Sequence, residues 1–338
     1  MQSELALIQE EHLGAISSRI APLEIDTEEL LEDFRRDCED RHMAESTIRR
    51  YATGLHCFFA FLRESKTPVL QVDRHVLKNF IHYRRVSGGE ENSGVRQKTI
   101  ENDFSALSLF YEFLVFEDYI QSSPVLAVRK RYLVRYKDDA DSESPMKLIS
   151  IDEMGMLVNS TLSPRDKAVV LLLAKTGLRR RELISVDIAD VNWVEQSITL
   201  KARKFKKRSN RIVFFDDETG RILREWMRIR SAIHSEADSL FLNERGGRLN
   251  RNGVYSLVTK CATQVGLHNP ASERQEEHFT PHCCRHWFTT HLRRSGMDRE
   301  FIKVLRGDAR NDSMSVYDHI DREELRKSYL ANIPQLGL

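Results

Sequence analysis

Apolar residues recur at helical spacing along most of the chain, and this pattern constrains the fold more than any other feature of the sequence. A helix predicted to begin at Ser46-Thr47-Ile48 carries its apolar residues on one face, at Tyr51, Leu55, Phe58, Phe59 and Leu62. Thr27 is predicted to cap the start of an earlier helix, and similar patterns predict helices that begin near Asp73 and Lys98, the last of them ended by Ser123-Pro124. The first part of the chain is therefore predicted to be an all-helical bundle.

The second part of the chain mixes helices with a few short strands. Ser163-Pro164 predicts a helix start, and further helices are expected over 219–231 and 252–265. In residues 188–200 apolar and polar side chains alternate as expected for two strands joined by a turn, and residues 212–215 fit a returning strand. The predicted fold class is thus mainly α with a small antiparallel β-sheet, that is, an α+β second domain.

A polar segment separates the two parts, and a length of 338 residues suggests two domains. We expect an N-terminal helix or extension over 1–24, a helical domain over 25–134, a linker over 135–147 and a second domain with a C-terminal tail over 148–338.

Several classes of protein are disfavoured by composition. The chain lacks an apolar run of about eighteen residues and a secretory signal, so we expect a soluble, cytoplasmic protein with no membrane partner. Its five cysteines include no CxxC pair, which argues against a disulfide framework and a structural zinc site. Cys283 and Cys284 are therefore expected to pack in the core.

Basic residues are clustered although the formal net charge is only +1. The clusters lie at 129–137, 179–181 and 201–211. A single cluster usually marks a solvated face, whereas three favour contact with a nucleic-acid backbone. The predicted DNA-binding residues are Arg129, Lys130, Arg131, Lys204, Lys207 and Arg208.

The stretch from Thr280 to His319 contains side chains that suit phosphodiester chemistry. Thr280-Pro281 predicts a helix start, and His282 and Arg285 then share one face at the helix end that favours anions. Tyr317 follows a loop rich in Gly, Asp, Asn and Ser, which suggests that its side chain is accessible rather than buried. Taken alone, such a His-Arg pair usually lies on the protein surface, and such a tyrosine is usually half-buried against its neighbours.

Three segments in the same order resemble the tyrosine recombinase family, which includes phage integrases and Xer-like proteins. TGLRRREL at 176–183 resembles its first arginine box, and TPHCCRHWFTTHL at 280–292 resembles its HxxR box. Tyr317 stands nine residues after Asp308, the position that follows Gly307, as the nucleophile of that family does. The resemblance runs from about Ile25 to Tyr329 and implies a core-binding DNA-binding bundle followed by a catalytic domain.

The resemblance implies a role for each site residue. Tyr317 would attack phosphorus and form a 3′-phosphotyrosyl intermediate without metal, ATP or other cofactor, while Arg179 and Arg285 would hold the phosphate. Guanidiniums suit that task because each donates paired hydrogen bonds. His282 would accept a proton or donate to the phosphate. A hairpin lysine would be the general acid; among Lys204, Lys206 and Lys207 we choose Lys206.

Asp308 departs from the pattern, because the family normally has histidine or tryptophan after this glycine. Its carboxyl group is expected to be protonated, to turn away and orient Arg285, or to weaken catalysis. His319, His286 or Arg306 could supply the missing donor. Glu182 is either a clamp on a guanidinium or an ordinary charge on a helix face.

The expected partner is double-stranded DNA with specific recombination sites. The tail over 321–338 suggests a homo-tetramer on DNA, because such tails dock on a neighbouring subunit in the family. Two alternatives remain open: strand relaxation like that of a type IB topoisomerase, and an integrase-derived protein that binds DNA with weakened catalysis. The helical bundle and the short chain favour the recombinase over the topoisomerase, and retention of the four principal residues argues against the second alternative.

Overall fold

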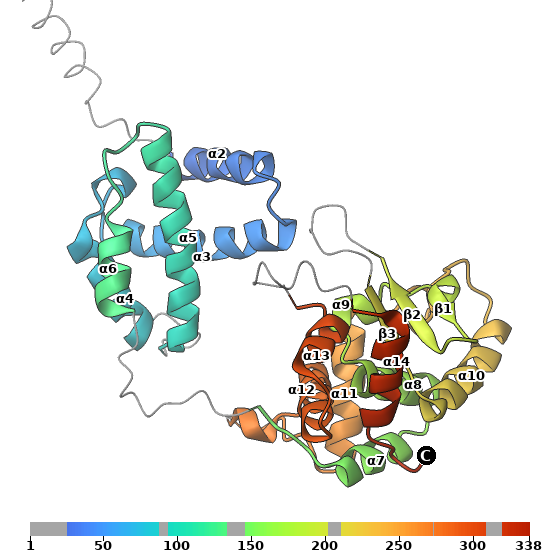
Figure 1. The fold of residues 1–338 in the computed structure, drawn as a ribbon. Helices are drawn as coiled ribbons and strands as arrows, with labels where there is room; N and C mark the ends of the chain where they lie inside the picture. The colour runs from blue at the N-terminus through green and yellow to red at the C-terminus, as the bar shows by residue number, and fades with distance from the viewer. Residues whose placement is uncertain (1–25, 88–93, 134–145, 202–210, 273, 309–319) are drawn as a thin grey trace, which may run out of the picture. The chain divides into compact units, whose positions relative to one another are not determined.

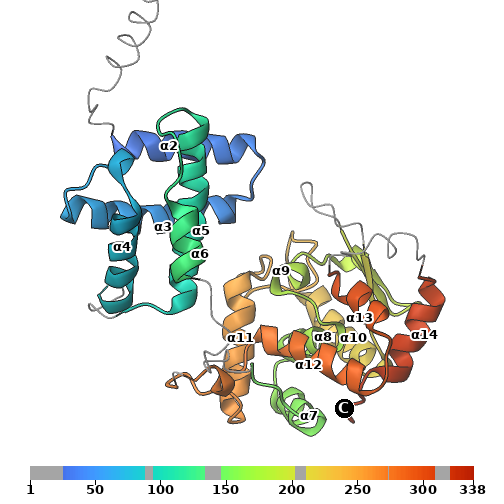
Figure 2. The same ribbon diagram turned by 60° about the vertical axis from the view of Figure 1, so that its left-hand side comes forward.

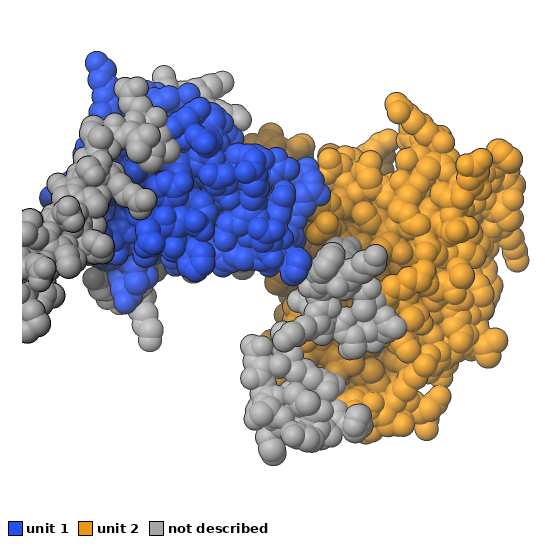
Figure 3. Space-filling view, turned by 90° about the horizontal axis from the view of Figure 1, so that it is seen from above, with its two compact units in different colours: residues 1–139 blue, residues 140–338 orange. Residues whose placement is uncertain are grey.

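A computed structural model describes residues 26–87, 94–133, 146–201, 211–272, 274–308 and 320–338. The chain divides into two compact units, residues 1–139 and residues 140–338, which Figure 3 draws in separate colours. The expected N-terminal helix over 1–24 and most of the expected linker lie outside the described residues. The exact domain boundaries therefore stay predictions.

The first unit is a bundle of helices, as the apolar periodicity predicts. Its elements are α2 (Thr27–Asp40), α3 (Glu45–Glu64), η1 (Val69–Gln71), α4 (Arg74–Val86), α5 (Gln97–Phe116) and α6 (Val125–Tyr132). The α3 helix packs against α5 and α2, and α6 packs against α4 and α5 (Figure 1). Phe58, Phe59 and Leu62 of the predicted apolar face are buried in this core, where Phe58 meets Phe80 edge to face.

Two local predictions in this unit need correction. Asp26 rather than Thr27 caps α2, because its carboxylate accepts from the backbone N–H of Glu28 (2.9 Å). The α5 helix already ends at Phe116, and Pro124 precedes the further helix α6 instead of ending α5. Proline is tolerated at a helix start, where its missing N–H has no partner to lose.

The second unit combines helices with a small sheet (Figures 1 and 2). Its elements are α7 (Ile151–Ser160), α8 (Pro164–Thr176), α9 (Arg180–Leu183), η3 (Ile188–Asp190), β1 (Val191–Asn192), β2 (Ser197–Leu200), β3 (Arg211–Phe214), α10 (Asp217–Ala232), α11 (Arg251–Gln264), η4 (Gln275–Glu277), α12 (Pro281–Arg294), α13 (Arg299–Arg306) and α14 (Arg322–Asn332).

The α8 helix forms the centre of this unit. Every residue from Ala168 to Ala174 is fully buried, and the helix packs against both α10 and α12. Ser163 caps its start by accepting from Asp166 N, with Pro164 at the first helical position, as predicted. A helix that is apolar all round in this way can only be a core element.

The sheet is antiparallel with the order β1-β2-β3, as predicted. Ile198 of the central strand pairs with Val191 on one side and Val213 on the other. The sequence predicts a hairpin tip over 201–211, of which residues 202–210 lie outside the described residues. The sequence also predicts a short strand over 240–242 before a turn at Gly246-Gly247, and this prediction needs correction. Around these described residues the structure has the isolated bridges Asp187 to Ser239 and Leu242 to Arg248 but no regular strand.

The C-terminal segment is held on its own unit by a buried charge network. Lys175 is completely buried, and its Nζ donates to Asp216 Oδ2 (2.6 Å), Glu218 Oε2 (2.8 Å) and the carbonyl oxygen of Pro334 (2.5 Å). Glu218 also accepts from the backbone N–H groups of residues 336–338. Two carboxylates and a carbonyl therefore compensate one buried ammonium.

A search of the described helices finds none with the length and apolar character needed to cross a membrane.

Candidate active site

Arg285 reaches the site from α12, which begins where the sequence predicts. The apolar side of this helix is buried and is formed by Cys283, Cys284, Trp287 and Phe288. This confirms the expected core packing of both cysteines. The side chain of Arg285 is only 3% exposed. Burial is the main reason why the pKa of Arg285 falls to about 10, and the nearby charges of Arg179 and Arg306 add to this effect. Arg285 nevertheless stays protonated near neutral pH.

A left-handed glycine brings Arg179 to the same place. Gly177 ends α8 with a φ of +62°, and Arg179 then becomes the N-cap of the short helix α9. A Cβ on Gly177 would lie 2.5 Å from the ring of Phe288 in α12. This close approach lets Arg285 Nη1 donate to the carbonyl oxygen of Gly177 (2.7 Å).

The carbonyl oxygen of Arg306 is the point on which three guanidiniums converge. It accepts from Arg211 Nη1 (2.6 Å), Arg285 Nη2 (2.8 Å) and Arg179 Nη1 (3.2 Å). Arg306 is the last residue of α13, where helix carbonyls lack helical partners and carry partial negative charge. The end of α13 therefore gathers side chains from three separate segments.

Glu182 clamps two of these guanidiniums. Its Oε1 accepts from Arg179 Nη1 (3.1 Å), while its Oε2 accepts from Arg211 Nη2 (2.8 Å) and from the backbone N–H of Arg179 (2.8 Å). Burial acts to raise the pKa of Glu182, but the charges of Arg211 and Arg179 and the backbone hydrogen bond outweigh it, so the pKa is lowered. Of the two interpretations drawn from the sequence, the clamp is the right one.

Asp308 faces the arginine cluster rather than turning away. Its Oδ1 accepts from Arg285 Nη2 (3.0 Å) and Arg179 Nη2 (3.2 Å), and its Oδ2 lies 3.2 Å from Arg306 Nε. The same carboxylate oxygen thus joins the two arginines that the sequence analysis assigned to a phosphate. Four guanidiniums meet two carboxylates here, which leaves an excess of positive charge on the named groups.

His282 and His286 stand one helical turn apart at the exposed edge of the same helix. Their ring centroids are 4.9 Å apart, and the rings are nearly perpendicular at 83°. The pKa of His282 is lowered, first by partial removal of its ring from water and then by the charges of His286 and Arg285. The pKa of His286 is also lowered, first by its partial burial and then by the charges of Arg306 and Arg285. Both rings are therefore mainly neutral near pH 7, so each has one nitrogen that can accept a proton.

The remaining predicted site residues fall in two groups. Tyr317, Lys204, Lys206, Lys207, Arg208 and the candidate donor His319 lie outside the described residues. Arg129, Lys130 and Arg131 form the last turn of α6 in the first unit. Lys130 and Arg131 are exposed, whereas Arg129 is half-buried and donates to Ser108 Oγ (2.9 Å). Their assigned roles stay predictions.

Arg211 is the site residue that the sequence analysis missed. It ends the basic run over 201–211, and nothing in that run distinguishes it. Arg211 is the first residue of β3, which packs beside α13, whereas the sequence predicts the returning strand only from residue 212. No spacing rule in the sequence links Arg211 to Glu182 or to the carbonyl of Arg306.

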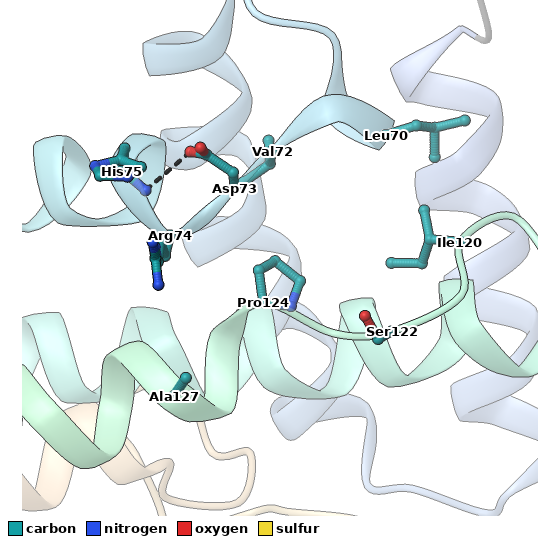
Figure 4. A pocket seen from close by; sticks show the side chains of 9 residues that line it. All are labelled: Leu70, Val72, Asp73, Arg74, His75, Ile120, Ser122, Pro124 and Ala127. Atoms are coloured by element: carbon teal, nitrogen blue, oxygen red, sulfur yellow. Dashed lines mark hydrogen bonds between the residues drawn. The ribbon is translucent and has the colours of Figure 1, made fainter.

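A pocket of about 450 Å³ lies in the first unit and is unrelated to this cluster. Figure 4 shows its lining, which includes Leu70, Arg74, His75 and Pro124, and the hydrogen bond from His75 N to the capping Asp73. All of its residues belong to unit 1, whereas every residue of the arginine cluster belongs to unit 2. The candidate active site is thus the cluster built by α9, α12, α13 and β3.

The fold and the site define a class of two-unit proteins. In this class a helical bundle precedes an α+β unit that carries the converging arginines. The model of the phage integrase family matches residues 147–324, and the model of the phage integrase N-terminal SAM-like domain matches residues 31–118. The first match alone covers more than half of the chain, so this chain belongs to the phage integrase family.

Relatives of known name agree with this placement. The chain is 25% identical over 306 residues to tyrosine recombinase XerD of Oceanobacillus iheyensis, a match that covers 88% of this chain and 95% of the relative. It is 26% identical over 304 residues to tyrosine recombinase XerC of Escherichia coli O139:H28, a match that covers 88% and 93%.

Two solved structures share the fold. The Tn1549 transposon integrase in complex with transposon right end DNA matches with a TM-score of 0.64 at 16% identity, covering 88% of this chain and 97% of that one. The XerH site-specific recombinase bound to palindromic difH substrate, in its post-cleavage complex, matches with a TM-score of 0.61 at 19% identity, covering 88% and 83%.

Proposed function

We propose that this protein is a site-specific DNA recombinase that cleaves and rejoins DNA strands through a 3′-phosphotyrosyl intermediate. One observation carries the proposal: Arg179 and Arg285, which are 106 positions apart in the chain, donate to the same carboxylate oxygen at 3.2 and 3.0 Å. Two guanidiniums that can grip one anionic oxygen can also grip one phosphate. Membership of the phage integrase family and relatives named tyrosine recombinases support the same function.

Arg179 and Arg285 would stabilise the charge that develops during cleavage. A phosphodiester is already anionic, and its five-coordinate transition state concentrates more negative charge on the oxygens. Both guanidiniums are held by backbone carbonyls before any substrate arrives, so little reorganisation is needed. Preorganised donors of this kind are the main source of catalysis at such sites.

Tyr317 would supply the nucleophile, and two further groups would move protons. The phenol oxygen attacks phosphorus, the bond from phosphorus to the 5′ oxygen breaks, and the phenol proton passes to neutral His282. Lys206 gives a proton to the departing 5′ oxygen. Rejoining is the reverse step, in which a free 5′ hydroxyl displaces the tyrosine. The bond energy is kept in the covalent intermediate, which explains why the proposed reaction needs no ATP.

DNA would be held by both parts of the chain. We assign residues 25–134 to a core-binding domain and residues 148–338 to a catalytic domain, with Arg129, Lys130, Arg131, Lys204, Lys207 and Arg208 on phosphates. Assembly into a homo-tetramer on two DNA sites through the C-terminal tail, and a cytoplasmic location, belong to the same proposal. Because Lys175 and Glu218 hold residues 334–338 on their own unit, a tail that reached a neighbour would first have to release them.

A covalent-trapping experiment tests this function. The full chain is incubated with a pool of nicked duplexes that contain a randomised segment, and protein linked to DNA is recovered from a denaturing gel and sequenced. An adduct that is absent in Tyr317→Phe supports the enzyme. Recombination between two recovered sites then separates a recombinase from a topoisomerase, which would relax supercoils without a partner site. Absence of any adduct would leave only the DNA-binding alternative.

A further inference from the structure

We infer that Asp308 is an internal counterion that occupies the place of the scissile phosphate and must leave it before DNA can be cleaved. The inference rests on the proposed function, since it concerns how the same site is regulated. Of the three expectations for Asp308, which were protonation, turning away to orient Arg285 and weakened catalysis, the inference develops the third.

The position of the carboxylate is the first argument. Its Oδ1 makes the hydrogen bonds to Arg179 Nη2 and Arg285 Nη2 that a phosphate oxygen would make. A carboxylate and a phosphate are both anions that guanidiniums bind in the same way, so they compete for the same donors. Two anions at one position repel each other, and the two guanidiniums cannot satisfy both.

The second argument is that both arginines have further hydrogen-bond partners besides Asp308. Arg285 is anchored independently by the carbonyl oxygens of Gly177 (2.7 Å) and Arg306 (2.8 Å). Arg179 is anchored independently by Glu182 Oε1 (3.1 Å) and by the same carbonyl of Arg306 (3.2 Å). A residue whose only task was to position these guanidiniums would therefore be redundant.

The third argument is that the side chain of Asp308 is more exposed than that of the arginine it contacts. The Asp308 side chain is 28% exposed, whereas the side chain of Arg285 is 3% exposed. The backbone of Asp308 is fixed by the hydrogen bond from its N–H to the carbonyl of Lys303 (3.1 Å). Rotation of the side chain alone would thus open the site, and Arg306, 31% exposed, could follow the carboxylate.

This arrangement has a consequence for the substrate. An isolated phosphate must compete with a carboxylate that is tethered beside the guanidiniums, so free inorganic phosphate should bind weakly. A duplex held by many other phosphate contacts delivers its phosphate at a high effective concentration and can displace Asp308. The site is thereby closed to stray anions and opens only on bound DNA.

Binding of inorganic orthophosphate to the full chain tests the inference. Asp308→Asn keeps the size and an acceptor oxygen but removes the charge, and Asp308→Ala removes both. We expect both variants to bind phosphate about tenfold or more tightly than the unmodified chain, as measured by calorimetry. The reason is that the Asp308 carboxylate no longer competes with phosphate for the hydrogen bonds of Arg179 and Arg285. A purely positioning role instead predicts unchanged binding in Asp308→Asn and weaker binding in Asp308→Ala, and either result would overturn the inference.

Glu323→Gln provides the matched control. Glu323 is exposed in the first turn of α14, so this change raises the net charge by the same amount without touching the cluster. We expect it to alter phosphate affinity by less than about twofold, because salt screens distant surface charges. A tenfold gain in this control as well would show a general charge effect and overturn the inference. Circular dichroism of each variant confirms that folded protein is compared.

The covalent-trapping assay distinguishes the two proposals. If adducts form but Asp308→Asn binds phosphate no more tightly, the inference fails and the function stands. If Asp308→Asn binds phosphate more tightly but no DNA yields an adduct, the counterion stands and the recombinase proposal fails.

Discussion

Backbone carbonyls, rather than acids alone, hold the arginines of this site. Arg285 donates to the carbonyl oxygens of Gly177 and Arg306, and Arg179 also donates to that of Arg306. A carbonyl fixes a guanidinium without cancelling its full charge, so positive potential is left for an anionic ligand. Two acids also contribute: Glu182 lies between Arg179 and Arg211, and Asp308 accepts from Arg179 and Arg285.

Replacing either principal arginine by lysine should show whether bidentate donation matters. We expect Arg179→Lys and Arg285→Lys each to lower single-turnover cleavage of a nicked duplex by about a hundredfold to a thousandfold, since an ammonium is only a point charge. Arg228→Lys, on the exposed face of α10, is the control and should cleave normally. Normal cleavage by both site variants would contradict the assignment.

Asp308→His tests the one departure from the family pattern. The change removes the carboxylate from Arg179 and Arg285 and introduces a neutral donor, so cleavage should be kept or raised. The same single-turnover assay measures it. A loss of about a hundredfold, similar to that of a missing transition-state donor, would show that Asp308 itself is essential.

Residue types in a local pattern could be predicted, but contacts across long stretches of chain could not. The pair Arg179 and Arg285 was identified from two short segments that resemble family boxes. The contribution of the Arg306 carbonyl was not, because any helix end offers such a group and only the folded chain decides which side chains reach it.

The junction between α8 and α12 is the element-scale feature that sets the site. Gly177 adopts φ +62° at the end of α8, directly against Phe288 of α12. Phe288 is 1% exposed and cannot retreat into solvent. A larger residue at position 177 would therefore separate the two helices and with them the carbonyl that anchors Arg285.

Gly177→Ala should consequently destabilise the fold more than an ordinary glycine replacement. Gly266→Ala is the matched comparison, because Gly266 has φ +73° but nothing within 4 Å of an added Cβ. We expect Gly266→Ala to cost about 1–2 kcal/mol through its left-handed backbone alone. Gly177→Ala should cost about 1–3 kcal/mol more through overpacking. Urea unfolding measures both, and equal losses would contradict the close packing.

Helix starts were predictable because their signals are local. Thr280-Pro281 and Ser163-Pro164 begin α12 and α8 as expected, since a proline at the first helical position acts on its own turn, as does the capping hydroxyl of Ser163 in α8. The α6 helix was missed because Pro124 was interpreted as a stop, although proline suits the start of the next helix equally well. The bridge from Asp187 to Ser239 joins residues 52 positions apart, and no local pattern predicts it.

At the scale of the whole molecule, each unit has its own core. Phe58, Phe80 and Phe104 lie in one core, and the α8 residues lie in the other. The presence of two units was predictable from a polar segment between two apolar patterns. The attachment of the C-terminal segment was not, because Lys175 and Pro334 are 159 positions apart and a lysine in an apolar helix gives no hint of its partner.

Four histidines of the second unit should make its stability fall on mild acidification. Burial lowers the pKa of His268, His282, His286 and His291, so the unfolded chain takes up protons more readily than the native one. The stability that their neutral forms contribute is complete above about pH 6.5 and is lost as pH falls through the lowered native pKa values.

Thermal melting between about pH 7.5 and 5.5 checks this expectation, because carboxylates mostly titrate below that window. The melting temperature should fall toward the acid end. The fall should be smaller in the double variant His282→Asn and His286→Asn, which removes two of the four groups. A melting temperature that rises on acidification would contradict the direction of these pKa shifts.

The most direct test of the central claim is to identify the residue that becomes attached to DNA. Trapped adducts are digested with protease and nuclease, and the linked peptide is sequenced by mass spectrometry. The account predicts that the 3′ phosphate of the DNA is linked to Tyr317. A phosphoryl group on any other residue, or a linkage to the 5′ end of the DNA, would contradict it.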